Sequence, residues 1–283
     1  MTSSPEKAID QQQLEQVLGH GIKIPPQPRV LLEIDELMQQ ADFSLKDLAR
    51  VIGKDVGLTA AVFKIANSPG MGSSRRIDSL DQAIAMLGSG PLVNMVKCSV
   101  LRQSLGGNAE VFVRFWDHAA DIASLAAAIA KKLRSVCNIF PDQAYAAGLF
   151  MDCGVPVLMQ RFPEYCQAYR NNYMSGWPNL LEEDQKVDCS HTAIGYFIAK
   201  HWRLPDFIAI SIRDHHDAVP HGYAMRTMSS ILLMAMHLRT LHHKWAPDPE
   251  WLLYQDIVLE ELGLSVEGLP EFEDEILETV WGI

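Results

Sequence analysis

Apolar residues recur every three or four positions along most of the chain, which is the spacing of an amphipathic helix. The segment PRVLLEIDELMQQ at 28–40 is typical, because its apolar residues share one helical face: Val30, Leu31, Ile34, Leu37 and Met38. No segment of strand length alternates apolar and polar residues between turn signals. The pattern therefore predicts an all-α protein of about 12 or more helices.

Capping residues and prolines indicate where these helices begin. Ser44 with Asp47 three residues later, and Ser79 with Gln82, resemble the capping box of a helix start. Proline suits the first turn of a helix, because its missing N–H needs no partner there. Four prolines stand at predicted starts of this kind: Pro91, Pro141, Pro163 and Pro205.

A long helix, rich in alanine in its second half, is expected over 109–136. Gly106 and Gly107 precede it, and two successive glycines are a strong signal for a helix end. We expect this glycine pair to separate an N-terminal helical lobe from the part of the chain that carries most of the histidines.

Charge and cysteine content narrow the classes of partner. A formal net charge of −11 disfavours nucleic acid and anionic membranes. No apolar run reaches the roughly 18 residues of a membrane-spanning helix, and the N-terminus does not resemble a signal peptide. The five cysteines form no Cys-x-x-Cys pair, which favours reduced thiols. We expect a cytoplasmic protein that binds neither nucleic acid nor membranes.

Four histidines and one aspartate are candidates for a shared site. We expect His118 and Asp152 on helices and His191, His215 and His216 at helix ends, each near a helix end or beside small residues. Metal sites in helical bundles are built from such side chains on facing helices. The alternative is that each histidine is an ordinary core or surface residue with a hydrogen bond. We assign that role to the remaining histidines considered: His20, His201, His237, His242 and His243.

Four segments, in order, resemble the HDOD domain, a bacterial relative of the HD and HD-GYP metallophosphohydrolases. They are IPPQP at 24–28, DVGLTAAVFKIANSPGMG at 55–72, RRIDSLDQAIAMLG at 75–88 and HTAIGYFIAKHWRLPDFIAISIRDHH at 191–216. The resemblance implies a multi-helical HD-domain/phosphodiesterase-like bundle with an N-terminal helical lobe.

The same resemblance divides the chain. It implies an N-terminal extension over 1–19 and an HDOD module over 20–216. Within that module, residues 20–107 form the N-terminal helical lobe and residues 108–216 the HD-like core. A C-terminal helical extension over 217–283 is expected to pack on the core.

The superfamily pattern gives one metal ion the first histidine, the His-Asp doublet and a late aspartate. His118 and Asp152 match this pattern, but Met151 stands where the doublet has histidine. The segment SSILLMAMHLRT contains no carboxylate, and Met236 or His237 falls at the place of the late aspartate. Methionine is a poor ligand for magnesium, manganese or ferrous iron. The resemblance therefore implies that this first site is degenerate and binds no metal.

The second ion of the HD-GYP pattern takes residues that are all present: Asp152, His191, His215 and His216. A single divalent ion at this place is the alternative to a metal-free polar cluster. In that cluster we expect His118 or His191 to lie within hydrogen-bond distance of Asp152 and Met151 to point into apolar packing. We also expect a shallow pocket between the helix over 109–136 and the helix ending at His216.

The resemblance implies a non-catalytic signal-transduction or scaffold module that binds a protein partner or a small signalling ligand. We expect no cofactor, no catalytic residues and a monomer or homodimer. The alternative function is a metal-dependent phosphohydrolase that acts on a cyclic dinucleotide or a nucleotide through the one retained metal site. The two missing ligands of the first site count against it.

The C-terminal extension contains two patterned segments. One is rich in methionine at helical spacing, which favours core packing over an adaptable partner surface: Met225, Met228, Met234 and Met236. The other, PEFEDEILETVWGI, predicts an acidic amphipathic helix with apolar positions at Phe272, Ile276, Leu277 and Val280. We expect it to dock on the core, with a dimer contact as the alternative.

Overall fold

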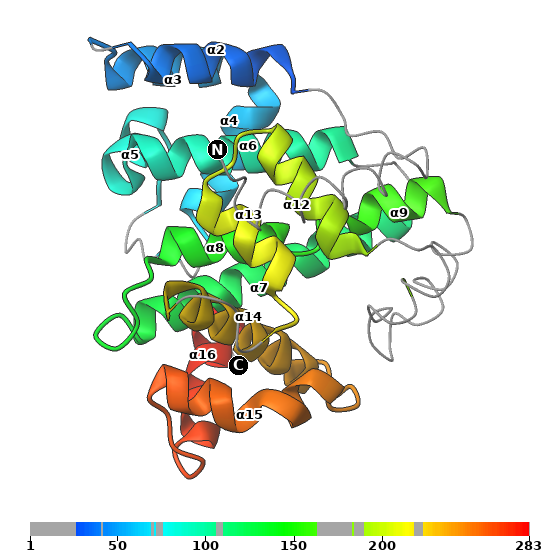
Figure 1. Cartoon of the computed structure of the whole chain (residues 1–283). Helices are drawn as coiled ribbons and strands as arrows, with labels where there is room; N and C mark the ends of the chain where they lie inside the picture. The colour runs from blue at the N-terminus through cyan, green and yellow to red at the C-terminus, as the bar shows by residue number, and fades with distance from the viewer. Residues whose placement is uncertain are drawn as a thin grey trace, which may run out of the picture.

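The computed structural model describes residues 27–40, 42–68, 71, 76–105, 110–162, 183, 190–217 and 223–282. Within these ranges the protein is helical and has no strand, so the all-α prediction is confirmed (Figure 1). The helices are α2 (Arg29–Met38), α3 (Leu45–Gly53), α4 (Val56–Ala66), α5 (Leu80–Leu87), α6 (Ser89–Leu105), α7 (Glu110–Lys132), α8 (Pro141–Phe150), α9 (Val155–Arg161), α12 (His191–His201), α13 (Asp206–Asp214), α14 (Tyr223–His242), α15 (Pro249–Leu262) and α16 (Leu269–Trp281).

Helix starts follow the local signals of the sequence. Ser44 caps α3 in a full capping box, because its side chain accepts from the Asp47 N–H while the Asp47 carboxylate accepts from the Ser44 N–H. Ser79 caps α5 by accepting from the Gln82 N–H. Gly88 ends α5 with φ at 83°, a value that glycine adopts without strain. These short-range predictions are confirmed.

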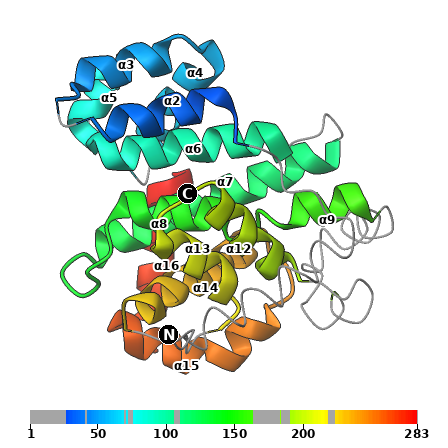
Figure 2. The ribbon, with the colours of Figure 1, turned by 45° about the horizontal axis from the view of Figure 1, so that its top comes forward.

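Helices α2 to α5 stack on one side of α6, and α7 and α8 lie on its other side (Figure 2). The buried Lys97 of α6 links α2 to the end of α12. Its ammonium group lies 2.7 Å from the Asp35 carboxylate of α2 and donates to the carbonyl oxygen of Arg203, just beyond α12. A buried lysine needs such partners, because an unpaired charge in the core is strongly disfavoured.

Helix α7 is buried along most of its length and separates two apolar cores. Phe115, Ala119 and Ala123 face a core shared with the N-terminal helices, α8, α9, α12 and α13. Leu125 and Ile129 face a second core shared with α8, α14, α15 and α16. The alanines keep α7 thin enough to be packed on two sides at once.

Helices α7 and α8 approach closely because the residues between them are small. A side chain on Gly148 would meet the backbone of Ala123 at 3.0 Å. The prediction that α7 extends to residue 136 is wrong: the helix ends at Lys132, and residues 133–136 form turns. Phe140 is extended, as expected for a residue before proline, so Pro141 begins a separate helix, α8.

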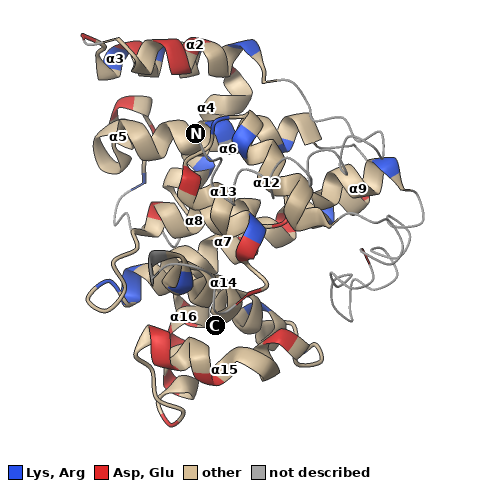
Figure 3. Cartoon of the chain, viewed as in Figure 1, with Lys and Arg blue, Asp and Glu red and all other residues tan. Residues whose placement is uncertain are grey.

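The C-terminal helices cover the second core. Met228 and Met234 are fully buried, and Met225 and Met236 pack against them, so the prediction of core packing is confirmed. Phe272 and Ile276 anchor α16 on the same core. Asp and Glu residues colour the outer helices α2, α3, α15 and α16 in Figure 3, in keeping with the net negative charge.

Among the described residues, no single helix has the length and apolar composition to cross a membrane. Helices α5 and α6 would meet that test only together, as a pair bent by 113°. Several predicted features lie outside the described residues: Gly106, Gly107, Pro163, His20 and most of the IPPQP segment.

Candidate functional site

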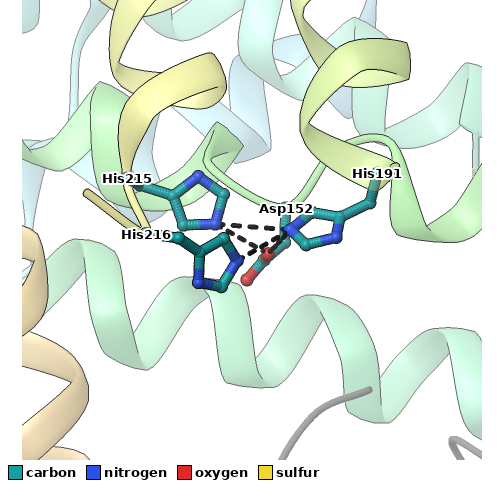
Figure 4. Close-up of side chains that lie close together, drawn as sticks. All are labelled: Asp152, His191, His215 and His216. Carbon is teal, nitrogen blue, oxygen red and sulfur yellow. Dashed lines mark hydrogen bonds and ion pairs between the residues drawn. The ribbon is translucent and has the colours of Figure 1, made fainter. Parts of the chain in front are cut away.

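Three segments bring Asp152, His191, His215 and His216 together (Figure 4). Their donor atoms all lie within 4.8 Å of one another. His191 is the first residue of α12, and His215 and His216 follow the last turn of α13, as predicted. Asp152 was expected on a helix, and this is wrong: α8 ends at Phe150, and Asp152 lies in the turn that leads to α9.

Glycine allows this turn to reach the start of α12. A Cβ atom on Gly154 would overlap the carbonyl oxygen of His191, and a Cβ atom on Gly195 would collide with the side chain of Ile212. Because neither residue has a side chain, the Asp152 turn packs directly on the backbone of α12, and the Ile212 side chain of α13 packs closely on Gly195 of α12. Ser190 completes the arrangement by capping α12 directly before His191.

Four of the six distances between these donors lie close to the edge length of a small tetrahedral metal site. His191 Nε2 lies 3.4 Å from His215 Nε2 and 3.1 Å from His216 Nε2. Asp152 Oδ1 lies 3.2 Å from His191 Nε2 and 3.3 Å from His215 Nε2. Metal–ligand bonds of about 2.0–2.1 Å in a tetrahedral site place neighbouring donors roughly 3.3–3.4 Å apart.

Each imidazole is oriented by an acceptor on its far nitrogen. His191 Nδ1 lies 2.8 Å from the Glu183 carboxylate, His215 Nδ1 lies 2.8 Å from the carbonyl oxygen of Ile212, and His216 Nδ1 lies 2.7 Å from the Glu250 carboxylate. A carbonyl or carboxylate oxygen can only accept, so each Nδ1 carries the hydrogen. In the neutral rings the three Nε2 lone pairs then face one another. Metal-binding histidines are held in this way.

The Asp152 carboxylate also has the surroundings of a metal ligand. Its side chain is buried, and no ring N–H of a described residue points at Oδ1 with hydrogen-bonding geometry, although two Nε2 atoms are near. A buried carboxylate oxygen without a donor is rare in folded proteins. A cation between Oδ1 and the three lone pairs would satisfy all four groups at once, so the residues fit a divalent metal ion.

The charges around the cluster set its protonation. Burial raises the pKa of Asp152, but the neighbouring His191 and His215 rings outweigh it and hold this pKa well below its usual range. Burial lowers the pKa of His191, yet the carboxylates of Glu183 and Asp152 raise it to about 10. Burial, aided by the other two rings, lowers the pKa of His216. Without a metal ion, His191 therefore carries an additional proton on Nε2, which a bound cation would displace.

His118 and Met151 lie outside the group of four. Burial and the Arg239 cation lower the pKa of His118 to about 3, while the nearby Asp152 carboxylate raises it slightly. Met151 is 2% exposed and packs in the second apolar core with α14, as predicted. His191 lies 3.2 Å from Asp152, so the predicted pairing with one of the two histidines is confirmed for His191.

Other histidines are outside the cluster, as expected. His237, near the place of the late aspartate, lies 2.7 Å from Glu273 and stacks on Trp251. His242 stacks on Trp281, and His201 is exposed.

Sequence reasoning missed Glu183 and Glu250, the two carboxylates that orient the rings. Glu183 lies eight residues before His191, and Glu250 belongs to the first turn of α15 in the C-terminal extension. Burial raises the pKa of Glu250 to about 7. The motif PDPE does mark a helix start, but nothing local indicates that this start faces His216.

Comparison with known proteins gives the context of this site. The chain is 28% identical over 205 residues to an uncharacterized protein of Treponema pallidum (strain Nichols), covering 70% of this chain and 38% of that protein. The chain thus spans less than half the length of this curated relative.

Two solved structures share the fold. One is named "Putative phosphohydrolase", from Shewanella amazonensis SB2B, with a TM-score of 0.68, 19% identity and coverage of 93% of this chain and 95% of that chain. The other is named "Putative signal transduction protein", from Marinobacter aquaeolei VT8, with a TM-score of 0.67, 21% identity and coverage of 100% and 66%. The family profile of the HDOD domain matches residues 24–218, and the chain belongs to the HDOD domain family.

Proposed function

We propose that this HDOD protein is a non-catalytic signal-transduction module whose His/Asp cluster holds one divalent transition-metal ion. The observation that carries the proposal is the convergence of three oriented Nε2 atoms and a buried Asp152 oxygen, all within 4.8 Å of one another. The sequence favoured a metal-free cluster, and this geometry supports the alternative.

The donor set indicates the class of ion. Three imidazoles and one carboxylate suit zinc or another borderline transition metal, whereas magnesium and calcium prefer oxygen ligands. Asp152, His191, His215 and His216 would hold the ion, which would tie the α8–α9 turn to α12 and α13. Glu250 would extend this link to α15, because it orients His216 from the C-terminal extension.

Two features support a structural or regulatory ion over a catalytic one. Four protein donors fill a tetrahedral shell, whereas catalytic zinc sites keep one position for water or substrate. The residues that would hold a second ion are absent: Met151 is packed in the apolar core, and α14 contains no carboxylate. The role of the ion would then be structural, because it would hold the α8–α9 turn, α12 and α13 together.

A one-metal phosphohydrolase is the second candidate. The same four residues favour it, because they are the ligands retained from the pattern that the resemblance implies. Such an enzyme would need the ion to accept a water molecule beyond the four protein donors. The names of the two structural neighbours, one a phosphohydrolase and one a signal transduction protein, agree with either candidate.

Metal analysis tests the proposal. Purified protein, supplied with zinc and dialysed, should retain about one equivalent by mass spectrometry. His191→Ala should lose it, while His201→Ala, an exposed histidine on the same helix, should keep it. Retention of no ion by the wild type would refute the metal site. Turnover of a phosphodiester that disappears in Asp152→Ala would refute the non-catalytic role.

A further inference from the structure

A cavity of about 450 Å³ lies between the N-terminal lobe and the HD-like core, with walls from α4, α6, α7 and α8. It lies apart from the His/Asp cluster and shares no lining residue with it. A volume of this size falls in the range of roughly 300–1,000 Å³ that small-molecule pockets occupy. Its position between two lobes is a common place for a ligand.

The charged side chains that line this cavity are all cations. Lys64 of α4 and Arg102 of α6 line it, and no Asp or Glu is among the described residues that do. Neither cation forms an ion pair with a described residue. In a chain with a net charge of −11, a cavity that carries two unpaired cations favours an anionic ligand.

Trp116 adds an unused hydrogen-bond donor. Its side chain is 3% exposed and lines the cavity, and its Nε1–H has no partner within the described structure. The Arg102 guanidinium lies over the same ring, 5.8 Å from its centroid. The indole N–H can only donate, and a buried donor without an acceptor is unfavourable. A ligand that brings an acceptor would remove this penalty.

Apart from Ser99 and Gln103, the remaining walls are mostly apolar and aromatic, and they include Phe112, Val113 and Leu149. We propose that this inter-lobe cavity binds a small organic anion, with its ring or aliphatic body against the apolar wall. A carboxylate or phosphate group would pair with Arg102 and Lys64, and an acceptor atom would receive the Trp116 N–H. The guanidinium fork suits either head group, because both present paired oxygens.

Two dyes of similar shape and different charge test this assignment. The aromatic sulfonate 8-anilinonaphthalene-1-sulfonate should bind saturably at one site per chain. Its neutral analogue N-phenyl-1-naphthylamine should bind at least tenfold more weakly. The double variant Lys64→Gln/Arg102→Gln should weaken the anionic dye at least tenfold, while the charge-matched double variant Lys46→Gln/Arg114→Gln on exposed surfaces should change it less than twofold.

Competition and NMR complete the test. Displacement by phenyl phosphate or by phenylacetate would support the site and identify its preferred head group. The indole resonance that is absent in Trp116→Phe should shift on binding. Equal binding of both dyes, an unaffected double variant, or failure of both competitors at millimolar concentration would overturn the assignment. If the double variant is unfolded, Lys64→Gln against Lys46→Gln gives the same comparison at exposed positions.

Discussion

Met151 and Asp152 are neighbours in the chain but belong to different parts of the molecule. Met151 lies in the apolar core that α7 and α8 share with α14. Asp152 lies in the polar cluster with the ends of α12 and α13. On the methionine side, two of the four residues that the resemblance assigns to a first metal ion are missing, and Met151 packs in the apolar core. On the aspartate side, the four candidate ligands Asp152, His191, His215 and His216 are all present, and each histidine ring is oriented by an acceptor on its Nδ1.

We infer from this contrast that the two halves of the proposed metal site can change independently. A packed methionine needs only apolar neighbours, so it tolerates loss of the metal on its side. The Asp152 cluster is different, because burying charged and polar groups is favourable only if each finds a partner.

The largest expected loss of stability follows from a change in the polar cluster that contains Asp152. Asp152→Ala should lower the free energy of unfolding by about 3–5 kcal/mol, because it leaves the buried His191 without one of its two carboxylates. Asp117→Ala, an exposed change on α7, should alter it by less than about 0.5 kcal/mol. Urea unfolding measures both, and similar values for the two variants would contradict the assignment of Asp152 to a buried ionic cluster.

Met151→Ala should have the next largest effect, about 2–5 kcal/mol, because it opens a cavity in the second core. Met151→Leu nearly conserves the volume and should cost less than about 1.5 kcal/mol. Both variants should keep the metal content of the wild type, measured by mass spectrometry after dialysis. Loss of the ion in Met151→Leu would show that the two sides of the contrast are not independent.

Glu250→Gln should weaken metal affinity tenfold to a hundredfold, about 1.4–2.7 kcal/mol, because the ring of His216 loses its charged acceptor. Glu260→Gln, an exposed change on the same helix, is the matched control. Competition with a chelator measures the affinity of each variant. An unchanged metal affinity in Glu250→Gln would show that α15 does not contribute to metal binding.

The smallest effect concerns His118 and pH. Its folded-state pKa is lowered to about 3, below the unfolded value of about 6.5. Between these values only the unfolded chain binds the extra proton, so this histidine makes stability fall as pH falls from 6.5 toward 3. Because His118 is partly exposed, we expect His118→Gln to remove about 1 kcal/mol of the loss between pH 7 and 5.

Urea unfolding of wild type and His118→Gln at several pH values checks this prediction, with His201→Gln as the exposed control. Parallel pH profiles for wild type and His118→Gln would show that His118 becomes protonated in the folded protein as readily as in the unfolded chain.

The predicted pocket beside the helix that ends at His216 stays a prediction. The described cavity lies on the opposite side of α8, toward α4 and α6. Its Lys64, Arg102 and Trp116 come from three helices, and none of them stands in a motif that suggests a ligand.

The sequence by itself determined the helical architecture, the helix starts at Ser44 and Ser79, and the four residues of the candidate metal site. Caps and periodicity depend on residues three or four positions apart, and ligand order survives in the linear motif.

Only the tertiary structure decided that α7 ends at Lys132 and that Asp152 lies in a turn. It also decided that Glu183 and Glu250 orient the rings of His191 and His216. These features depend on contacts between segments far apart in the chain. Hydrogen bonds across 34 residues, such as that of His216 with Glu250, leave no local spacing for a sequence pattern to reveal.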